Sequence, residues 1–114
     1  MPTATTQQAE AIRGKKMRWT WTDGPTKGSS HDHEFHKDGS VEYRSADAKK
    51  GEKSTREKEY SARQVADDVY LVSYLGSSGY TLTVALNFKD HHMVGIASGA
   101  KDWYPVEGTF EVLE

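Results

Sequence analysis

The sequence has no cysteine, no long apolar run and no excess of one charge, and each absence excludes a class of protein. Without cysteine the chain has no disulfide framework, thiolate zinc site, iron–sulfur cluster or thiol nucleophile. No segment approaches the roughly 18–20 apolar residues of a membrane helix, so we expect no membrane partner. The first residues lack the basic and apolar segments of an export signal, which predicts a cytoplasmic protein.

The charges of the chain are balanced, because 15 Lys and Arg stand against 17 Asp and Glu for a formal net charge of −2. This balance argues against a surface that binds phosphates by bulk charge, so we expect no nucleic-acid partner. Apolar residues make up only 35% of the chain, but three Trp, six Tyr and three Phe supply much buried area per residue. A length of 114 residues fits one domain, and we expect a flexible segment over residues 1–10 and a single domain over 11–114.

Apolar residues alternate with polar ones along most of the chain, which is the pattern of half-buried β-strands. Met17, Trp19 and Trp21 share one face of the first such segment. Along residues 80–88 the even positions are apolar and the odd positions hold Thr, Ala and Asn, so we expect the even face to be core. Strands are predicted over residues 16–22, 30–36, 40–45, 55–61, 69–75, 80–88, 92–98 and 104–113. No long helical period occurs, which predicts an all-β fold.

Short turns join the eight predicted strands. Asp38-Gly39 is the clearest of them, because Asp-Gly between two strand patterns is a strong hairpin signal. Eight strands with hairpin connections predict an eight-stranded up-and-down antiparallel β-barrel, of the calycin or lipocalin-like kind, with a two-sheet sandwich as the alternative architecture. Residues 6–12 fit either a short N-terminal helix that ends at Gly14 and plugs one end of the barrel, or a disordered tail.

Aromatic side chains recur along the predicted strands and indicate a cavity with an aromatic wall, although core packing accounts for at least one of the paired Trp rings. An inward Arg44 would hold a carboxylate through its two-pronged guanidinium, whereas on the rim it would be exposed. Asn87 is either a hydrogen-bonding group of the cavity or a turn former at the end of a strand. The predicted ligand-binding residues are Trp19, Trp21, His33, Tyr43, Arg44, Tyr74, Asn87 and Trp103.

His31 and His33 are separated by one residue, so on a strand their side chains point the same way. Such a pair chelates a metal when a neighbouring strand supplies a third ligand. The alternative is a pair that is half-exposed or hydrogen-bonded inside the barrel, and we do not predict a metal site. No P-loop, serine nucleophile elbow or dinucleotide-binding glycine pattern occurs, so the sequence names no cofactor.

Several strings of the sequence carry a family resemblance. They are WTWTDGP at residues 19–25, HEFHKDG at 33–39, YTLTVALNF at 80–88, VGIAS at 94–98 and WYPVEGTF at 103–110. Over about residues 12–114 the chain resembles the small MoaF-like domains, which are named for a protein associated with molybdenum-cofactor biosynthesis. The resemblance implies an eight-stranded calycin-type barrel with a small-molecule cavity, and it does not establish molybdenum chemistry.

Two functions agree with these residues. The first is a barrel that binds a small, partly aromatic or hydroxylated ligand and has no complete catalytic set. The second is an enzyme acting on a small aromatic carboxylate, similar in style to phenolic acid decarboxylases, with His31 or His33 as acid or base and Arg44 as clamp. Those enzymes use a tyrosine pair where this chain has Trp19 and Trp21, which supply no phenolic hydroxyl. A third interpretation is a barrel that forms a homodimer or docks onto a partner.

Overall fold

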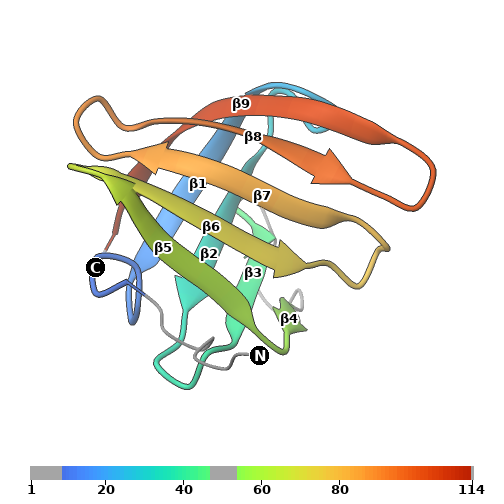
Figure 1. Cartoon of the computed structure of the whole chain (residues 1–114). Helices are drawn as coiled ribbons and strands as arrows, with labels where there is room; N and C mark the ends of the chain where they lie inside the picture. Colours follow the sequence, from blue (N-terminus) through green and yellow to red (C-terminus); the bar gives the residue numbers. More distant parts are fainter. Residues whose placement is uncertain (1–8, 47–53, 114) are drawn as a thin grey trace.

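The computed structural model of the chain describes residues 9–46 and 54–113 (Figure 1). Nine strands and no helix lie in this part of the chain. The strands are β1 (Lys16–Asp23), β2 (Ser30–Phe35), β3 (Val41–Ser45), β4 (Thr55–Glu57), β5 (Tyr60–Ala66), β6 (Val69–Leu75), β7 (Thr81–Asn87), β8 (His92–Ser98) and β9 (Trp103–Val112). The predicted all-β class is therefore confirmed. The described residues contain no helix with the length and apolar character that a membrane span needs.

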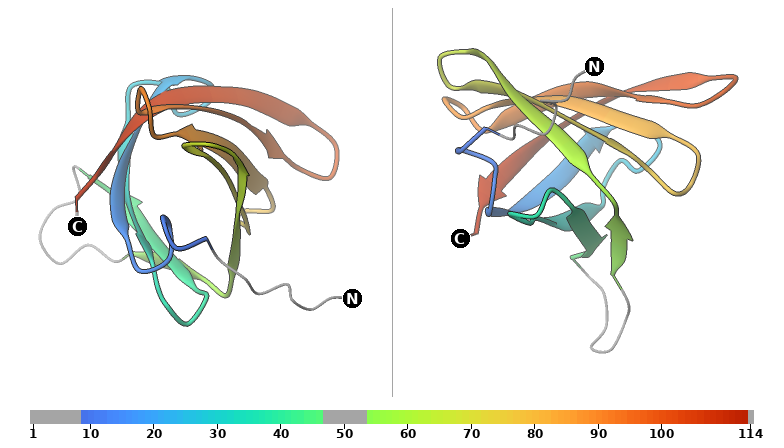
Figure 2. Two further views of the ribbon diagram at one scale, coloured as in Figure 1. Left: turned by 60° about the vertical axis from the view of Figure 1, so that its left-hand side comes forward. Right: turned by 60° about the horizontal axis from the view of Figure 1, so that its bottom comes forward.

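All nine strands belong to one antiparallel sheet, in the order β4-β3-β2-β1-β9-β8-β7-β6-β5. The first strand pairs with the second and also with the last, so the sheet curls into a nearly closed barrel (Figure 2). The predicted antiparallel barrel is confirmed. Its two sheet edges, β4 and β5, are consecutive in the chain, and the amide of Tyr60 at the start of β5 donates to the carbonyl of Gly39 at 2.9 Å.

The strand predicted over residues 55–61 is wrong in one respect, because the chain forms two strands there and the barrel has nine instead of eight. The reason is the facing of two side chains. Glu57 and Tyr60 are both buried, at 7% and 3% exposure, yet they are three residues apart. A regular strand would direct them to opposite faces. The chain therefore bends at the exposed pair Lys58-Glu59, and β4 and β5 become separate edges.

A hydrogen-bonded turn, and no helix, precedes β1 in the described residues. The amides of Ile12 and Arg13 both donate to the carbonyl of Ala9 at 2.9 Å. The rest of the predicted N-terminal helix, and residues 1–8 of the segment expected to be flexible, lie outside the described residues. Ile12 is fully buried, and the amide of Ala9 donates to the carbonyl of Ala62 in β5 at 2.9 Å. The turn thus packs into the barrel beside the first residues of β1.

The core follows the alternation seen in the sequence. Met17, Trp19 and Trp21 of β1 are buried, and Val84 and Leu86 show that the even face of β7 points inward, as predicted. The remaining buried apolar residues are Ile12, Phe35, Val41, Tyr60, Ala62, Val72, Tyr74, Met93, Val106 and Phe110. Because this core fills the part of the barrel near the N-terminal turn, the other end is left to hold a cavity.

Candidate functional site

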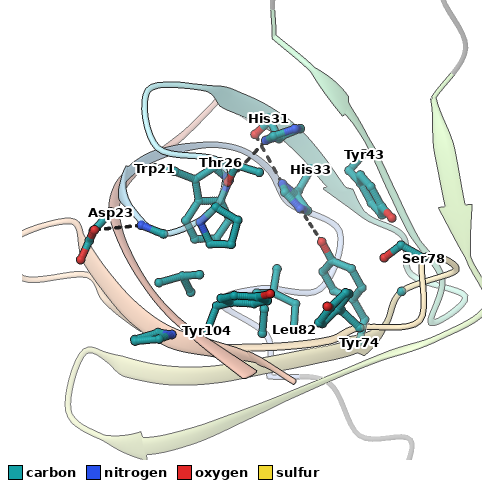
Figure 3. Close-up of a pocket in the computed structure, with 17 residues that line it drawn as sticks. Trp21, Asp23, Thr26, His31, His33, Tyr43, Tyr74, Ser78, Leu82 and Tyr104 are labelled. Carbon is teal, nitrogen blue, oxygen red and sulfur yellow. Dashed lines mark hydrogen bonds between the residues drawn. The ribbon is translucent and has the colours of Figure 1, made fainter. Parts of the chain in front are cut away.

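A cavity of about 800 Å³ opens at the end of the barrel where β1 finishes (Figure 3). Five aromatic side chains form much of its wall: Trp21, Tyr43, Tyr74, Tyr80 and Tyr104. Besides the tyrosines, the cavity is lined by three titratable groups, namely the imidazoles of His31 and His33 and the carboxylate of Asp23. No lysine or arginine occurs among the described residues that line it. The cavity is thus apolar and aromatic, with a few fixed polar groups.

His33 lies at the inner wall of the cavity and connects it to the core. Its ring stacks on Trp19 at a centroid distance of 4.0 Å and on Tyr43 at 5.4 Å. Its Nδ1 lies 3.4 Å from the carbonyl oxygen of His31, and its Nε2 lies 2.9 Å from the Tyr74 hydroxyl. A carbonyl only accepts, so Nδ1 carries the hydrogen and Nε2 accepts from Tyr74 (Figure 3). Burial, and after it the nearby His31, lower the pKa of His33 to about 3, so the ring is neutral.

His31 is half-buried at the cavity wall and is also held as a neutral ring. The indole Nε1 of Trp21 donates to its Nδ1 at 3.2 Å, which places the hydrogen of the imidazole on Nε2. Burial lowers the pKa of His31, and the neighbouring Asp32 carboxylate opposes that shift only in part. Neither imidazole of the cavity therefore supplies a positive charge at neutral pH.

Tyr43 of β3 and Tyr74 of β6 form another side of the cavity, with ring centroids 5.5 Å apart. The Tyr43 hydroxyl donates to Oε2 of the buried Glu57 at 2.8 Å, and the amide of Ser77 donates to the same oxygen at 2.9 Å. Burial, and then the hydrogen bond to Glu57, raises the pKa of Tyr43 to about 12. Burial likewise raises the pKa of Tyr74. Both phenols keep their hydrogens at any pH at which the protein would be used.

Two further tyrosines stand at the mouth of the cavity and share one carboxylate. Tyr80 donates to Oδ1 of Asp102 at 2.8 Å, and Tyr104 donates to Oδ2 of the same residue at 3.0 Å. Their ring centroids are 5.9 Å apart. The hydrogen bond to Asp102 is the main reason that the pKa of Tyr80 is raised to about 12. Asp102 therefore fixes the orientation of two aromatic rings at once.

Four of the eight predicted ligand-binding residues line the cavity, namely Trp21, His33, Tyr43 and Tyr74. Trp19 does not reach it, because its fully buried ring lies beneath His33 in the core. Arg44 is exposed on the outer face of β3, where it stands opposite Asp32 of β2.

The other two predicted residues lie at strand ends. The side-chain oxygen of Asn87 accepts from the amide of Lys89 at 2.9 Å, so Asn87 is the turn former of the two alternatives. Trp103 is 65% exposed. Its neighbour Tyr104 lines the cavity instead, because it shares strand parity with the buried Val106 and Phe110. That parity was the signal in the sequence that favoured Tyr104 over Trp103.

The described residues contain one cluster with the spacing of metal ligands, and it lies outside the cavity. Glu34, His36 and Glu42 place one ligand atom each within 4.8 Å of one another. The two ring nitrogens of His36 lie 3.8 Å and 3.2 Å from the carboxylates of Glu34 and Glu42, and Ser54 donates to Glu42. Hydrogen bonds from Ser54 and His36 lower the pKa of Glu42. His31 and His33 are not members of this cluster.

Comparisons with known proteins agree with this architecture. Among solved structures, a “putative beta-lactamase” from Burkholderia vietnamiensis superposes with a TM-score of 0.73, over 95% of this chain and 100% of that chain. The two sequences are 15% identical, so the likeness supports the barrel fold alone. No curated protein matches the sequence. The pattern of the MoaF N-terminal domain matches residues 3–102, and the chain therefore belongs to the MoaF N-terminal domain family.

Proposed function

We propose that the barrel binds a small organic molecule in the cavity at its open end. One observation carries the proposal, namely a cavity of about 800 Å³ with an aromatic wall and a few polar groups held in place by other side chains. Sites for small molecules in proteins are typically about 300–1,000 Å³, mostly apolar, and equipped with a small number of fixed polar groups. The His33–Tyr74 and Trp21–His31 hydrogen bonds supply such groups here.

The alternative function, an enzyme that clamps a small carboxylate, draws no support from the placement of its residues. Its clamp was Arg44, which is exposed on the outer face of β3 and does not line the cavity. His31 and His33 both line the cavity, but burial lowers the pKa of each, and their hydrogen bonds hold the neutral rings as opposite tautomers. We therefore propose binding, without a catalytic step.

The test uses a substitution that fills the cavity and a matched one that does not. Ala97 of β8 lines the cavity, whereas Ser98 is the next residue on the same strand and is exposed on the other face. Ala97→Phe places a ring in the cavity, and Ser98→Phe places the same ring outside it. Each protein is incubated with a metabolite extract, and its mass is measured under native and denaturing conditions.

We expect the wild-type protein and Ser98→Phe to carry added mass that is lost on denaturation, and Ala97→Phe to be bare. A bare wild-type protein, or equal added mass in all three proteins, would overturn the proposal. Circular dichroism of each variant shows whether the barrel is folded. Should Ala97→Phe fail to fold, the smaller change Ala97→Leu takes its place with Ser98→Leu as control.

A further inference from the structure

We infer that the cavity selects an organic cation, such as a protonated arylalkyl amine, over neutral and anionic molecules of the same shape. This inference rests on the proposed function and adds the class of ligand. It follows from the direction of the hydrogen bonds at the four tyrosines of the cavity, and from where the surrounding charges lie.

All four tyrosine hydroxyls in the cavity wall have their one hydrogen committed to a protein acceptor. Those of Tyr80 and Tyr104 donate to the two oxygens of Asp102, at 2.8 Å and 3.0 Å. That of Tyr43 donates to Glu57, at 2.8 Å, and that of Tyr74 donates to Nε2 of His33, at 2.9 Å. A phenol has one donor, so what remains for a ligand at each oxygen is its capacity to accept. The tyrosine oxygens of the wall therefore suit a ligand that donates hydrogen bonds.

The aromatic faces of the same residues favour positive charge. A cation over an aromatic ring is attracted by the electron density of the ring face, and Trp and Tyr are the stronger partners. Trp21, Tyr43, Tyr74, Tyr80 and Tyr104 surround the cavity. Three of these tyrosines donate to carboxylates, which increases the electron density of their rings. Cages of aromatic side chains recognise ammonium groups in this way.

The charges around the cavity act in the same direction. Asp23 lines it, and Asp102 and Glu57 stand directly behind its tyrosines. The lysines of the surrounding loops, Lys27 and Lys101, are exposed and do not line it. His31 is neutral because its Nδ1 accepts from Trp21, and burial keeps His33 neutral. A carboxylate ligand would meet tyrosine acceptors and negative charge here, with the neutral Nε2–H of His31 as a donor but without an arginine or lysine to pair with.

The test compares four probes that share one benzyl group and differ in charge: benzylammonium, benzyltrimethylammonium, benzyl alcohol and phenylacetate. Binding to the wild-type protein is measured at neutral pH by isothermal titration calorimetry. We expect benzylammonium to bind about tenfold more tightly than benzyl alcohol, which corresponds to about 1.4 kcal/mol, and phenylacetate to bind more weakly than either. Benzyltrimethylammonium carries the charge but has no N–H. Its affinity relative to benzylammonium and benzyl alcohol therefore shows how much of the preference comes from the ring faces and how much from hydrogen bonds.

A second arm removes one of the carboxylates that hold the tyrosines. Asp102 is not among the residues that line the cavity and acts through Tyr80 and Tyr104, so it is a positioning residue, and Asp102→Asn keeps its shape while removing its charge. We expect the ratio of benzylammonium to benzyl alcohol affinity to fall several-fold in this variant. Asp67→Asn makes the same change at an exposed position in the β5–β6 turn and should leave the ratio unchanged.

The outcomes separate the inference from the proposed function. Equal binding of benzyl alcohol and benzylammonium, or preferred binding of phenylacetate, overturns the cation inference while the cavity stays a binding site. Absence of binding by all four probes overturns the inference. The proposed function then depends on the Ala97→Phe comparison alone. A ratio in Asp102→Asn equal to that of the wild-type protein contradicts the role given to Asp102.

Discussion

His33 joins the core of the barrel to its cavity. One ring nitrogen is tied to the backbone of the same strand and the other to Tyr74, while the ring face lies on Trp19. In the neutral ring, Nδ1 donates to that backbone carbonyl and Nε2 accepts from Tyr74, so both nitrogens are satisfied without a charge in the core. A proton added to His33 would place a charge in the core and change the hydrogen bond with Tyr74. It would therefore affect both the stability of the fold and the geometry of the site.

The low pKa of His33 predicts that acid destabilises the fold. The pKa is about 3 in the folded chain and would be 6.5 for a free histidine. Below pH 6.5 the histidine binds a proton in the unfolded chain, whereas in the folded chain it stays unprotonated down to about pH 3. The free energy of unfolding therefore decreases as the pH falls from 6.5 to about 3. The slope approaches about 1.4 kcal/mol per pH unit and vanishes above pH 6.5. His33→Gln has no imidazole at this position, so between pH 6 and pH 4 its free energy of unfolding should fall less steeply with pH, by up to about 1.4 kcal/mol per pH unit.

The measurement is urea unfolding at a series of pH values, and the slope is compared instead of the absolute stability, because the variant also loses stacking on Trp19. His91→Asn removes an exposed imidazole from the β7–β8 turn, where φ is 58° and Asn is tolerated. It is the control for the loss of a histidine as such. A slope in His33→Gln as steep as that of the wild-type protein would contradict the account of His33.

At the scale of single residues, the sequence predicted the types of side chain in the cavity better than their identity. The alternation along β1 correctly placed Trp19 and Trp21 on one inward face. It could not show that Trp19 lies too deep and that only Trp21 reaches the cavity. Depth along a strand depends on how far the core extends from the N-terminal turn, which is a property of the packed barrel. Arg44 is a different case, because Val41 and Tyr43 form the inward face of the same strand and the parity of β3 therefore places Arg44 on the outer face.

Among the elements, the corner between β4 and β5 closes the barrel without a ladder of strand pairs. Glu57 replaces the ladder there, since its Oε2 accepts from Tyr43 of β3 and from the amide of Ser77 after β6. One carboxylate of the edge strand β4 thus connects β3 to the turn after β6. The polar residues of β4 are typical of a sheet edge, but the buried carboxylate among them gave no pattern from which a corner could be expected.

Substitution of Glu57 should therefore loosen the corner. In Glu57→Ala the Tyr43 hydroxyl and the Ser77 amide lose their acceptor, and a typical hydrogen bond contributes about 1 kcal/mol to stability. We expect the melting temperature to fall and the cavity wall at Tyr43 to become less ordered. Thermal unfolding followed by circular dichroism measures the change. Glu59→Ala, at an exposed position two residues away, should leave the melting temperature close to that of the wild-type protein.

For the whole molecule, protection from hydrogen exchange should follow the order of strands in the sheet. β1 has partners on both sides, over five residue pairs with β2 and six with β9. β4 is a three-residue edge strand that pairs only with β3. Amides of β1 and β9 should be among the slowest to exchange and those of β4 among the fastest. Exchange measured by mass spectrometry tests this order, and protection of β4 equal to that of β1 would contradict it.

The architecture was the most predictable level of this protein. Period-two alternation and short turns specify antiparallel hairpins locally, and a run of such hairpins leaves few arrangements besides a curled sheet. The pairing of β1 with β9 followed from closure instead of from any local signal. The cavity could be expected in general terms only, because its volume depends on which side chains leave space between facing strands.

The pairing of the first strand with the last also has a consequence for biosynthesis. A ribosome releases β1 before β9, so Met17 cannot pair with Val112 until all the strands between them have been made. During that time β1, which carries Trp19 and Trp21, has no partner on the side where β9 will pair. Such contacts between distant parts of a chain fold slowly and leave edges available for wrong partners. The arrival of β9 therefore ends the period in which this edge is open to wrong partners.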